Sequence, residues 1–251
     1  MAIEVASIAI LGAILGSFLN VVIHRLPRGE SLVSPGSRCP ECGTDIAPYD
    51  NVPVLSWLLL RGRCRHCGVR ISPRYPAVEL LTAAAFAAVV AVRGFDDDLV
   101  LELPFVASLI ALAGIDLDHK LLPNKIVYPM AAYGLVATAL VDTDELVEHL
   151  IAGAGGFLFL FVAVLAYPRG MGMGDVKLAG AMGLYLGLSI VPAMLVAFLA
   201  GTVVGLGIIA REGAQARKKA VPFGVFLALG GIVGVLAGPE LIELYEDRFL
   251  D

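Results

Sequence analysis

Two aspartates, Asp116 and Asp175, stand beside apolar sequence, where a charged side chain is costly. Asp116 follows Ile115 at the end of one hydrophobic run, and Asp175 follows Gly172-Met173-Gly174 at the start of another. An ionisable group at membrane depth is treated first as a functional site. Two carboxyl groups that meet there would share one proton, because both cannot ionise cheaply. Such a dyad can supply a base and an acid for hydrolysis.

The glycines of Gly170-x-Gly172-x-Gly174 permit positive φ and a close approach of other backbone. An extended peptide could therefore reach the Asp175 carboxylate. Irregular backbone at membrane depth is tolerated only where it is buried in protein or lines a wet cavity. The alternative interpretation is a flexible loop with a membrane-flanking pair, Asp175 and Lys177.

The elements that must hold these carboxylates are long apolar segments. The 251 residues are 58% hydrophobic and 16% charged, with a mean hydropathy of +0.84, whereas soluble domains carry roughly 25% charged residues. We predict an all-α polytopic membrane protein with about eight transmembrane helices, since a span needs about 20 apolar residues. The expected spans are 3–23, 77–93, 98–115, 124–141, 146–167, 176–190, 190–210 and 222–244.

The charges along the chain predict the orientation of these helices. All but two of the 18 Lys and Arg residues lie in four alternate segments, 24–76, 116–125, 167–177 and 211–220. The intervening segments are acidic, as at Asp96-Asp97-Asp98 and at the C-terminal end. Because basic segments stay in the cytoplasm, both termini are expected outside. Asp116 and Asp175 then lie at the cytoplasmic membrane face.

All four cysteines lie in the polar segment 24–76, as Cys39-Pro40-Glu41-Cys42 and Cys64-Arg65-His66-Cys67. The spacing C-x2-C-x21-C-x2-C is close to that of zinc ribbons. Four thiolates fill a tetrahedral shell, so a zinc ion here would be structural rather than catalytic. The alternatives are two disulfides or four unconnected thiols. A reducing cytoplasm disfavours the disulfides, and the paired spacing disfavours unconnected thiols. His66 is expected to be a surface residue.

Arginines surround the second cysteine pair, and they permit two interpretations. Zinc ribbons often bind nucleic acid through basic residues, whereas a cytoplasmic loop near anionic lipid carries the same charge. We favour membrane lipid as the partner and expect no nucleic acid. These residues are Arg61, Arg63, Arg65, Arg70 and Arg74.

Within the first aspartate motif, Asp118 is the rival of Asp116. Asp116 is the deeper carboxylate because it directly follows Ile115, whereas Asp118 falls in a polar turn. We therefore expect Asp116 to be catalytic. Asp118 is expected to be an auxiliary or structural group, paired with Lys120 or Lys177.

Six motifs follow one another from the first apolar run to the last. They are Gly16-Ser17-Phe18-Leu19-Asn20-Val21-Val22-Ile23-His24-Arg25-Leu26-Pro27, the paired cysteines, Arg74-Tyr75-Pro76-x-Val78-Glu79, Ile115-Asp116-x-Asp118-His119, Gly172-x-Gly174-Asp175-x-Lys177 and Pro222-Phe223-Gly224. Together they resemble the type IV prepilin peptidases, bacterial intramembrane aspartic proteases of the G-x-G-D kind. One departure is Val225, where many members have a second proline; we expect it to touch neither aspartate.

This resemblance implies a peptidase that cuts the short basic leader from type IV prepilins or pseudopilins. Cleavage would occur at the cytoplasmic face of the bacterial inner membrane, after a glycine and before the apolar N-terminal helix of the substrate. The family's catalytic aspartates map onto Asp116 and Asp175. Many members with the tetracysteine domain also methylate the new N-terminus with S-adenosyl-L-methionine, and this chain keeps that domain.

We accordingly divide the chain into a first transmembrane helix (1–23), a cytoplasmic zinc-binding tetracysteine domain (24–76) and a membrane-embedded aspartic peptidase domain (77–251). Glu79 enters the second span, where a carboxylate needs a partner or a role. We consider it a candidate for binding the methyl donor or the N-terminal amine of the substrate.

Two other functions fit part of the sequence. A carboxylate-based transporter would also place acidic residues in spans, but it would usually show internal repeats, and none is convincing here. A membrane-tethered zinc-ribbon binding protein accounts for the cysteines and arginines. It leaves both aspartate motifs unexplained.

Overall fold

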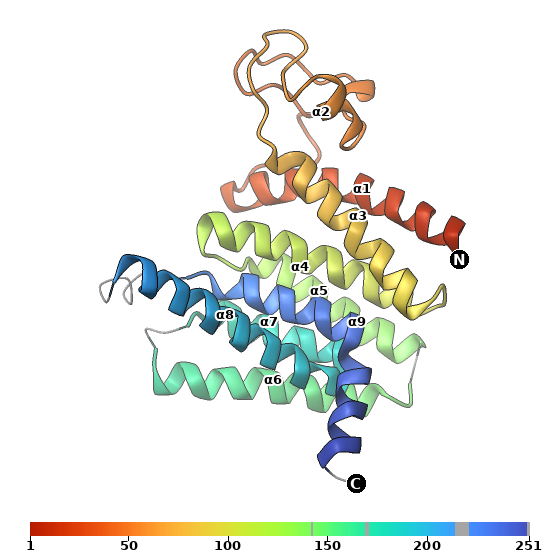
Figure 1. Ribbon diagram of the computed structural model, residues 1–251, viewed down its shortest axis with the longest axis vertical. Coiled ribbons are helices and arrows are strands. Elements are labelled where there is room, and N and C mark those ends of the chain that lie inside the picture. Colours follow the sequence, from red (N-terminus) through yellow and green to blue (C-terminus); the bar gives the residue numbers. More distant parts are fainter. Residues whose placement is uncertain (142, 169–170, 214–220, 250–251) are drawn as a thin grey trace. The chain divides into compact units, whose positions relative to one another are not determined.

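The computed structural model describes residues 1–141, 143–168, 171–213 and 221–249, which form helices and turns without a β-strand. The predicted all-α class is confirmed for this part of the chain. The chain divides into two compact units, Met1–Phe95 and Asp96–Asp251. Figure 1 shows the helices of both units.

In the first unit, α1 (Ala2–Arg25) packs lengthwise against α3 (Arg74–Arg93), as Figure 1 shows. Glycines allow the close contact: a Cβ added at Gly16 would lie 2.7 Å from Glu79 Cα. Small residues at helix interfaces let backbones approach in this way. The buried Asn20 adds a polar link, since its Nδ2 donates to the Tyr75 carbonyl at 3.0 Å.

The polar segment between α1 and α3 contains three short helices, η1 (Leu26–Arg28), η2 (Pro48–Asp50) and α2 (Leu55–Leu59). Each cysteine pair sits in a tight turn closed by a glycine N–H. Gly43 donates to Cys39 O at 2.9 Å, and Gly68 donates to Cys64 O at 3.0 Å. Both glycines have positive φ, 68° and 72°, which side-chain-bearing residues rarely adopt.

The second unit contains α4 (Leu99–His119), α5 (Asn124–Val141), α6 (Leu146–Ala166), α7 (Met173–Leu186), η3 (Gly187–Ser189), α8 (Ile190–Glu212) and α9 (Phe223–Phe249). Helix α7 is central, because it packs against α5, α6 and α9. The core includes the fully buried side chains Leu109, Leu112 and Ile115 of α4 and Met182 of α7.

Helix α7 is short because polar groups from neighbouring helices bind its C-terminal end. The Leu184 carbonyl accepts hydrogen bonds from Thr138 Oγ1 at 3.4 Å and from His149 Nδ1 at 3.0 Å. Beyond the helix, Glu148 Oε1 accepts the Leu188 N–H at 2.8 Å. Gly187, with φ 51°, turns the chain into α8. The 14 residues of α7 span about 21 Å at ~1.5 Å per residue, less than the ~30 Å hydrocarbon core.

Helices occur at all eight expected spans, but length and apolar composition alone support fewer crossings. Among the described residues, six segments are long and apolar enough to cross a membrane: Ala2–Arg28, Arg74–Arg93, Leu99–His119, Leu146–Ala166, Met173–Glu212 and Phe223–Phe249. They leave out α5 and join α7 to α8. The count of eight and the orientation therefore stay predictions. Residues 142, 169–170, 214–220 and 250–251, which include residues used in the charge pattern, lie outside the described residues.

The contact between α6 and α7 tests how this unit packs. A Cβ at Gly183 would lie 2.5 Å from the backbone of Ala152 and Gly153, whereas one at Gly205 of α8 would meet open space. Overpacking costs typically about 1–3 kcal/mol. We expect Gly183→Ala to lower the thermal unfolding midpoint in detergent, and Gly205→Ala to leave it unchanged or raise it. Equal midpoints for the two variants would contradict this packing.

Candidate active site

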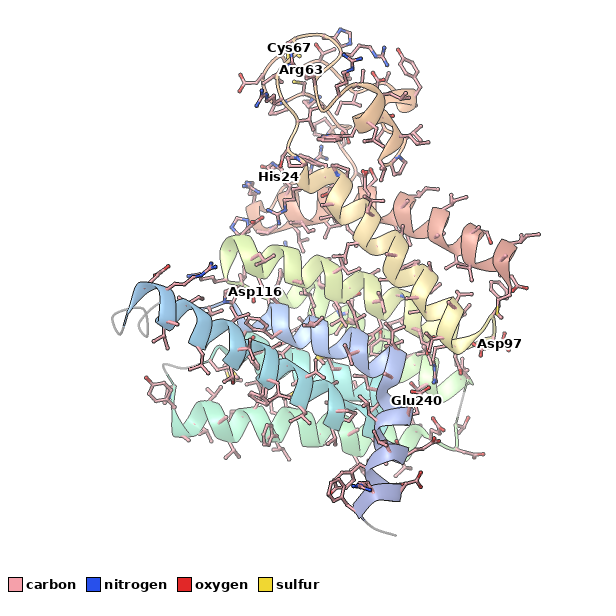
Figure 2. All side chains as sticks on the ribbon, in the orientation of Figure 1. His24, Arg63, Cys67, Asp97, Asp116 and Glu240 are labelled. Atoms are coloured by element: carbon pink, nitrogen blue, oxygen red, sulfur yellow. The ribbon has the colours of Figure 1, made fainter. Side chains whose placement is uncertain are left out.

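Asp116 lies in the last turn of α4 and is buried, with 5% of its surface exposed. Figure 2 labels it. The helix ends at Lys120, whose left-handed backbone (φ 50°) lets its N–H donate to Asp116 O at 2.9 Å. The neighbouring Asp118 is exposed. Asp116 is thus more deeply buried than Asp118, as expected from the sequence. The chemical role of each carboxylate stays a prediction.

The carboxylate of Asp116 faces the start of α9. The backbone N–H groups of Gly224 and Val225 lie near it, and a Cβ added at Gly224 would come within 2.8 Å of Asp116 Oδ2. That oxygen is buried without a hydrogen bond of normal geometry to any described residue. An unpaired buried carboxylate oxygen is costly, so it is suited to hold a proton or a bound polar group.

Asp175 is held differently, in the first turn of α7. Its Oδ2 accepts the Gly172 N–H at 3.1 Å, and its own N–H donates to Gly172 O at 3.2 Å. These reciprocal bonds cap the helix. The carboxylate lies beside the amide-rich N-terminal end of α7, which stabilises negative charge. Asp175 is also buried, with 8% of its surface exposed. Gly170, the first glycine of the motif, lies outside the described residues.

Leu122 brings the two aspartate-bearing elements together. It lies in the turn between α4 and α5, and it contacts the starts of both α7 and α9. A Cβ at Gly174 would lie 3.0 Å from Leu122 Cβ, and one at Gly224 would lie 2.8 Å from Leu122 Cδ2. The charges of Asp116 and Asp175 are close enough to interact. Two like charges in a buried site resist double ionisation.

One sequence expectation changes here, and the pairing of Asp118 with Lys120 or Lys177 stays a prediction. Lys177, one suggested partner of Asp118, donates to Asn124 Oδ1 at 3.2 Å and lies 5.3 Å from the centre of the Tyr128 ring. The expectation that Val225 touches neither aspartate is wrong, because its backbone N–H is one of the two amides near Asp116. The motif Pro222-Phe223-Gly224 can be recognised in the sequence, but the sequence gives no sign that it lies beside Asp116.

The four cysteines form a separate candidate metal site in the first unit. Their Sγ atoms all lie within 4.8 Å of one another, and those of Cys39 and Cys67 are 3.7 Å apart. A tetrahedral zinc with Zn–S bonds of ~2.3 Å needs sulfurs about 3.8 Å apart, so this set fits such an ion. All four are free thiols, so the disulfide alternative is not seen. His66 is exposed and outside the group.

Hydrogen bonds within the cysteine segment prepare this site. Bonding to the side chain and backbone of Thr44 lowers the pKa of the Cys42 thiol to about 6, which favours its thiolate. Desolvation and hydrogen bonds with the other three cysteines instead raise the pKa of Cys67. Arg65 binds Asp50 through Nε at 2.8 Å and NH2 at 2.5 Å. This pairing lowers the pKa of Asp50. Arg65, one of the arginines expected to lie near anionic lipid, therefore also stabilises the cysteine segment. Figure 2 labels its neighbours Arg63 and Cys67.

Glu79 is buried on α3 and has partners within the first unit. Its Oε2 accepts the Val54 N–H at 2.7 Å, and Ser17 also hydrogen-bonds to the carboxylate. Val54 has φ 62°, an outlier for a β-branched residue. The carboxylate therefore holds a strained turn of the cysteine segment.

Comparisons with known proteins match both units. Residues 10–93 match the model of the bacterial peptidase A24 N-terminal domain, and residues 103–209 match that of the type IV leader peptidase family. The second match contains Asp116 and Asp175. No solved structure matches the chain.

Curated relatives cover most of the chain, and those compared below are named prepilin leader peptidase/N-methyltransferase. The protein of Aeromonas hydrophila is 36% identical over 94% of this chain and 91% of its own length. That of Bacillus subtilis (strain 168) is 35% identical over 94% and 95%, respectively. That of Myxococcus xanthus (strain DK1622) is 42% identical over 78% of this chain and 61% of its own length.

Proposed function

The chain belongs to the type IV leader peptidase family, and on this basis we propose that it removes the basic leader of type IV prepilins or pseudopilins by an aspartic mechanism. The observation that carries this proposal is that two buried carboxyl groups, Asp116 at the end of α4 and Asp175 at the start of α7, lie close enough for their charges to interact.

The surroundings of the two carboxylates support a single shared proton. Asp175 lies at the N-terminal end of α7, and Asp116 faces that of α9. Both helix ends stabilise one negative charge on the pair, and burial opposes a second. The ionised aspartate takes a proton from water as the water attacks the scissile carbonyl. The protonated one polarises the carbonyl oxygen and then supplies a proton to the leaving amine.

The membrane arrangement proposed for this reaction keeps the eight spans with both termini outside. The dyad then faces the cytoplasm of a bacterial cell, at the inner membrane, where a basic leader meets an acidic site. We keep the functional division into a first transmembrane helix (1–23), a zinc-binding domain (24–76) and a peptidase domain (77–251).

The relatives' name supports a second activity, methylation of the new N-terminus with S-adenosyl-L-methionine as the methyl donor. Glu79 stays the candidate for holding the donor or the amine, although one of its oxygens already accepts the Val54 N–H. The transporter and the tethered binding protein are not favoured, because the match to leader peptidases includes both aspartate motifs.

The metal proposed for the cysteine site is one structural zinc ion. Cys39, Cys42, Cys64 and Cys67 would supply all four ligands, which leaves no open position for catalysis. Its role would be to hold the two turns of the segment together.

The dyad makes a direct prediction. General acid–base groups contribute about 10²–10⁴-fold to rate, so Asp116→Asn and Asp175→Asn should each reduce leader cleavage at least about 100-fold. The measurement is the loss of leader mass from a purified prepilin. Adding S-adenosyl-L-methionine to the wild-type reaction should then add the mass of a methyl group.

Asp118→Asn is the matched control, since it removes an exposed carboxylate of the same turn. It should retain cleavage. Normal cleavage by either Asp116→Asn or Asp175→Asn would refute the dyad, and a larger loss in Asp118→Asn would reverse the choice within the first motif.

Gly224→Ala tests the contact between α9 and the dyad without removing a carboxylate. Its Cβ would lie 2.8 Å from Asp116 Oδ2 and Leu122 Cδ2, so it must displace the carboxylate or the helix. We expect kcat for leader cleavage to fall at least about tenfold, since small misplacements at a reacting centre are costly. Gly207→Ala, which meets open space on α8, should keep wild-type kcat. Equal kcat values for both variants would contradict the contact.

Metal analysis tests the cysteine site. The wild-type protein purified without chelator should carry about one zinc ion per chain, and Cys64→Ser should lose it, because a structural site needs all four ligands. His66→Ala should keep the metal. Zinc content that is unchanged in Cys64→Ser, or absent from the wild type, would rule this site out.

A further inference from the structure

Helix α2 carries an apolar face that points out of the cysteine segment. Leu55, Leu58 and Leu59 follow one another at helical spacing, and all three are exposed, Leu59 with 82% of its surface. We call these three residues the leucine face of α2. The helix itself contains no charged residue. A contiguous apolar surface of this kind, in a segment that is otherwise polar, marks a contact with a partner or with a membrane.

Hydrogen bonds fix the opposite face of α2 to the cysteine segment. Ser56 is buried, and its Oγ donates to the Tyr49 carbonyl at 2.9 Å. Trp57 donates from Nε1 to the Ile71 carbonyl at 3.1 Å. Its ring also packs closely on Gly62, where an added Cβ would lie 2.8 Å from the indole. The leucine face cannot turn inward without breaking these contacts, so its exposure is built into the fold of the segment.

The leucine face meets the apolar surface of α1. Leu55 lines a cavity of about 660 Å³ together with Ile10 and Ile14 of α1, both of which are exposed. These two residues belong to Ala2–Arg28, which is long and apolar enough to cross a membrane. Ile10 lies about 22 Å before Arg25, the last residue of α1, at ~1.5 Å per residue. The cysteine segment therefore borders α1 at a depth where acyl chains surround a spanning helix.

The charges next to the leucine face suit anionic headgroups. Residues 53–71 contain no Asp or Glu, and their four arginines are exposed. Arg61 and Arg63 follow α2 closely, and the nearby Asp50 is already paired with Arg65. An apolar face flanked by basic residues is typical of a helix that lies in a membrane interface. Arginine side chains in this position reach back to the headgroups.

We propose that the leucine face of α2 inserts into the acyl layer of the membrane beside α1, with Arg61 and Arg63 at the level of the headgroups. The cysteine segment then lies in the membrane interface and is not a domain free in the cytoplasm. A second copy of the chain or a prepilin matches this face less well, because Leu55 shares its cavity with a helix surface that acyl chains cover. The inference concerns the first unit alone and uses no step of the peptidase reaction.

Tryptophan quenching tests the insertion in the full-length protein, since Trp57 is the only tryptophan of the chain. Leu59→Trp adds an indole to the leucine face, whereas His66→Trp adds one at another exposed position of the same segment. Each protein is placed in vesicles of phosphatidylcholine and phosphatidylglycerol, with or without bromine on the acyl chains.

We expect bromine to quench a larger fraction of the emission in Leu59→Trp than in the wild type, because the added indole lies among acyl chains. His66→Trp should lose no larger fraction than the wild type. The same quenched fraction in Leu59→Trp and His66→Trp would overturn the proposal.

Photocrosslinking identifies what covers the leucine face, and it keeps the test open if Leu59→Trp folds poorly. A photoreactive phenylalanine at position 59, or at 58 in a second variant, should form an adduct with the mass of a phospholipid. The same residue at position 66 should form none. An adduct at 58 and 59 with only a second copy of the chain, or with only an added prepilin, would overturn the proposal in favour of that protein partner. No adduct at either position would also overturn it.

The two proposals fail separately. A wild-type protein that forms the lipid adduct but cleaves no prepilin would support this inference and refute the proposed function. Normal cleavage of a prepilin without a lipid adduct at 58 or 59 would overturn this inference alone.

Discussion

The burial of two carboxyl groups, Asp116 and Asp175, in one apolar unit is the constraint on which the second unit depends. Each carboxylate faces the N-terminal end of a helix, whose backbone amides offset part of the cost of desolvation. Asp175 is held by the cap of α7, and Asp116 faces the first amides of α9. The ends of three helices, α4, α7 and α9, must therefore meet in a fixed arrangement.

Close helix packing makes this arrangement possible. Gly224 leaves room for the Asp116 carboxylate and for Leu122, which also contacts Gly174 at the start of α7. At its other end, α7 is stopped by bonds from Thr138 and His149 to one carbonyl. Because both ends of this short helix are bound, Asp175 has little freedom to shift along the helix axis. The polar groups far from the dyad thus help to position it.

The first unit uses charged side chains in a different way. Arg25 and Glu79 bind backbone groups of the cysteine segment, and Arg65 binds Asp50 within it. In a segment with few regular elements, such bonds replace the hydrogen-bond ladders of helices and sheets. The bonds of Arg25 and Glu79 hold the cysteine segment beside α1. Residues of α1 and of this segment line one cavity between them.

The sequence by itself determined the helical class, the two aspartates and the cysteine set, because apolar runs and ligand spacings are local patterns. It also ranked Asp116 as deeper than Asp118, because Asp116 directly follows the apolar Ile115 and Asp118 lies two residues further along, among polar residues. Only the tertiary structure decided that Gly224 and Val225 lie beside Asp116, and that Leu122 contacts Gly174 and Gly224. Contacts between distant helices leave no local signal. The partner of Glu79 was hidden for the same reason: Val54 lies in an irregular segment, and its position follows from packing rather than from periodicity.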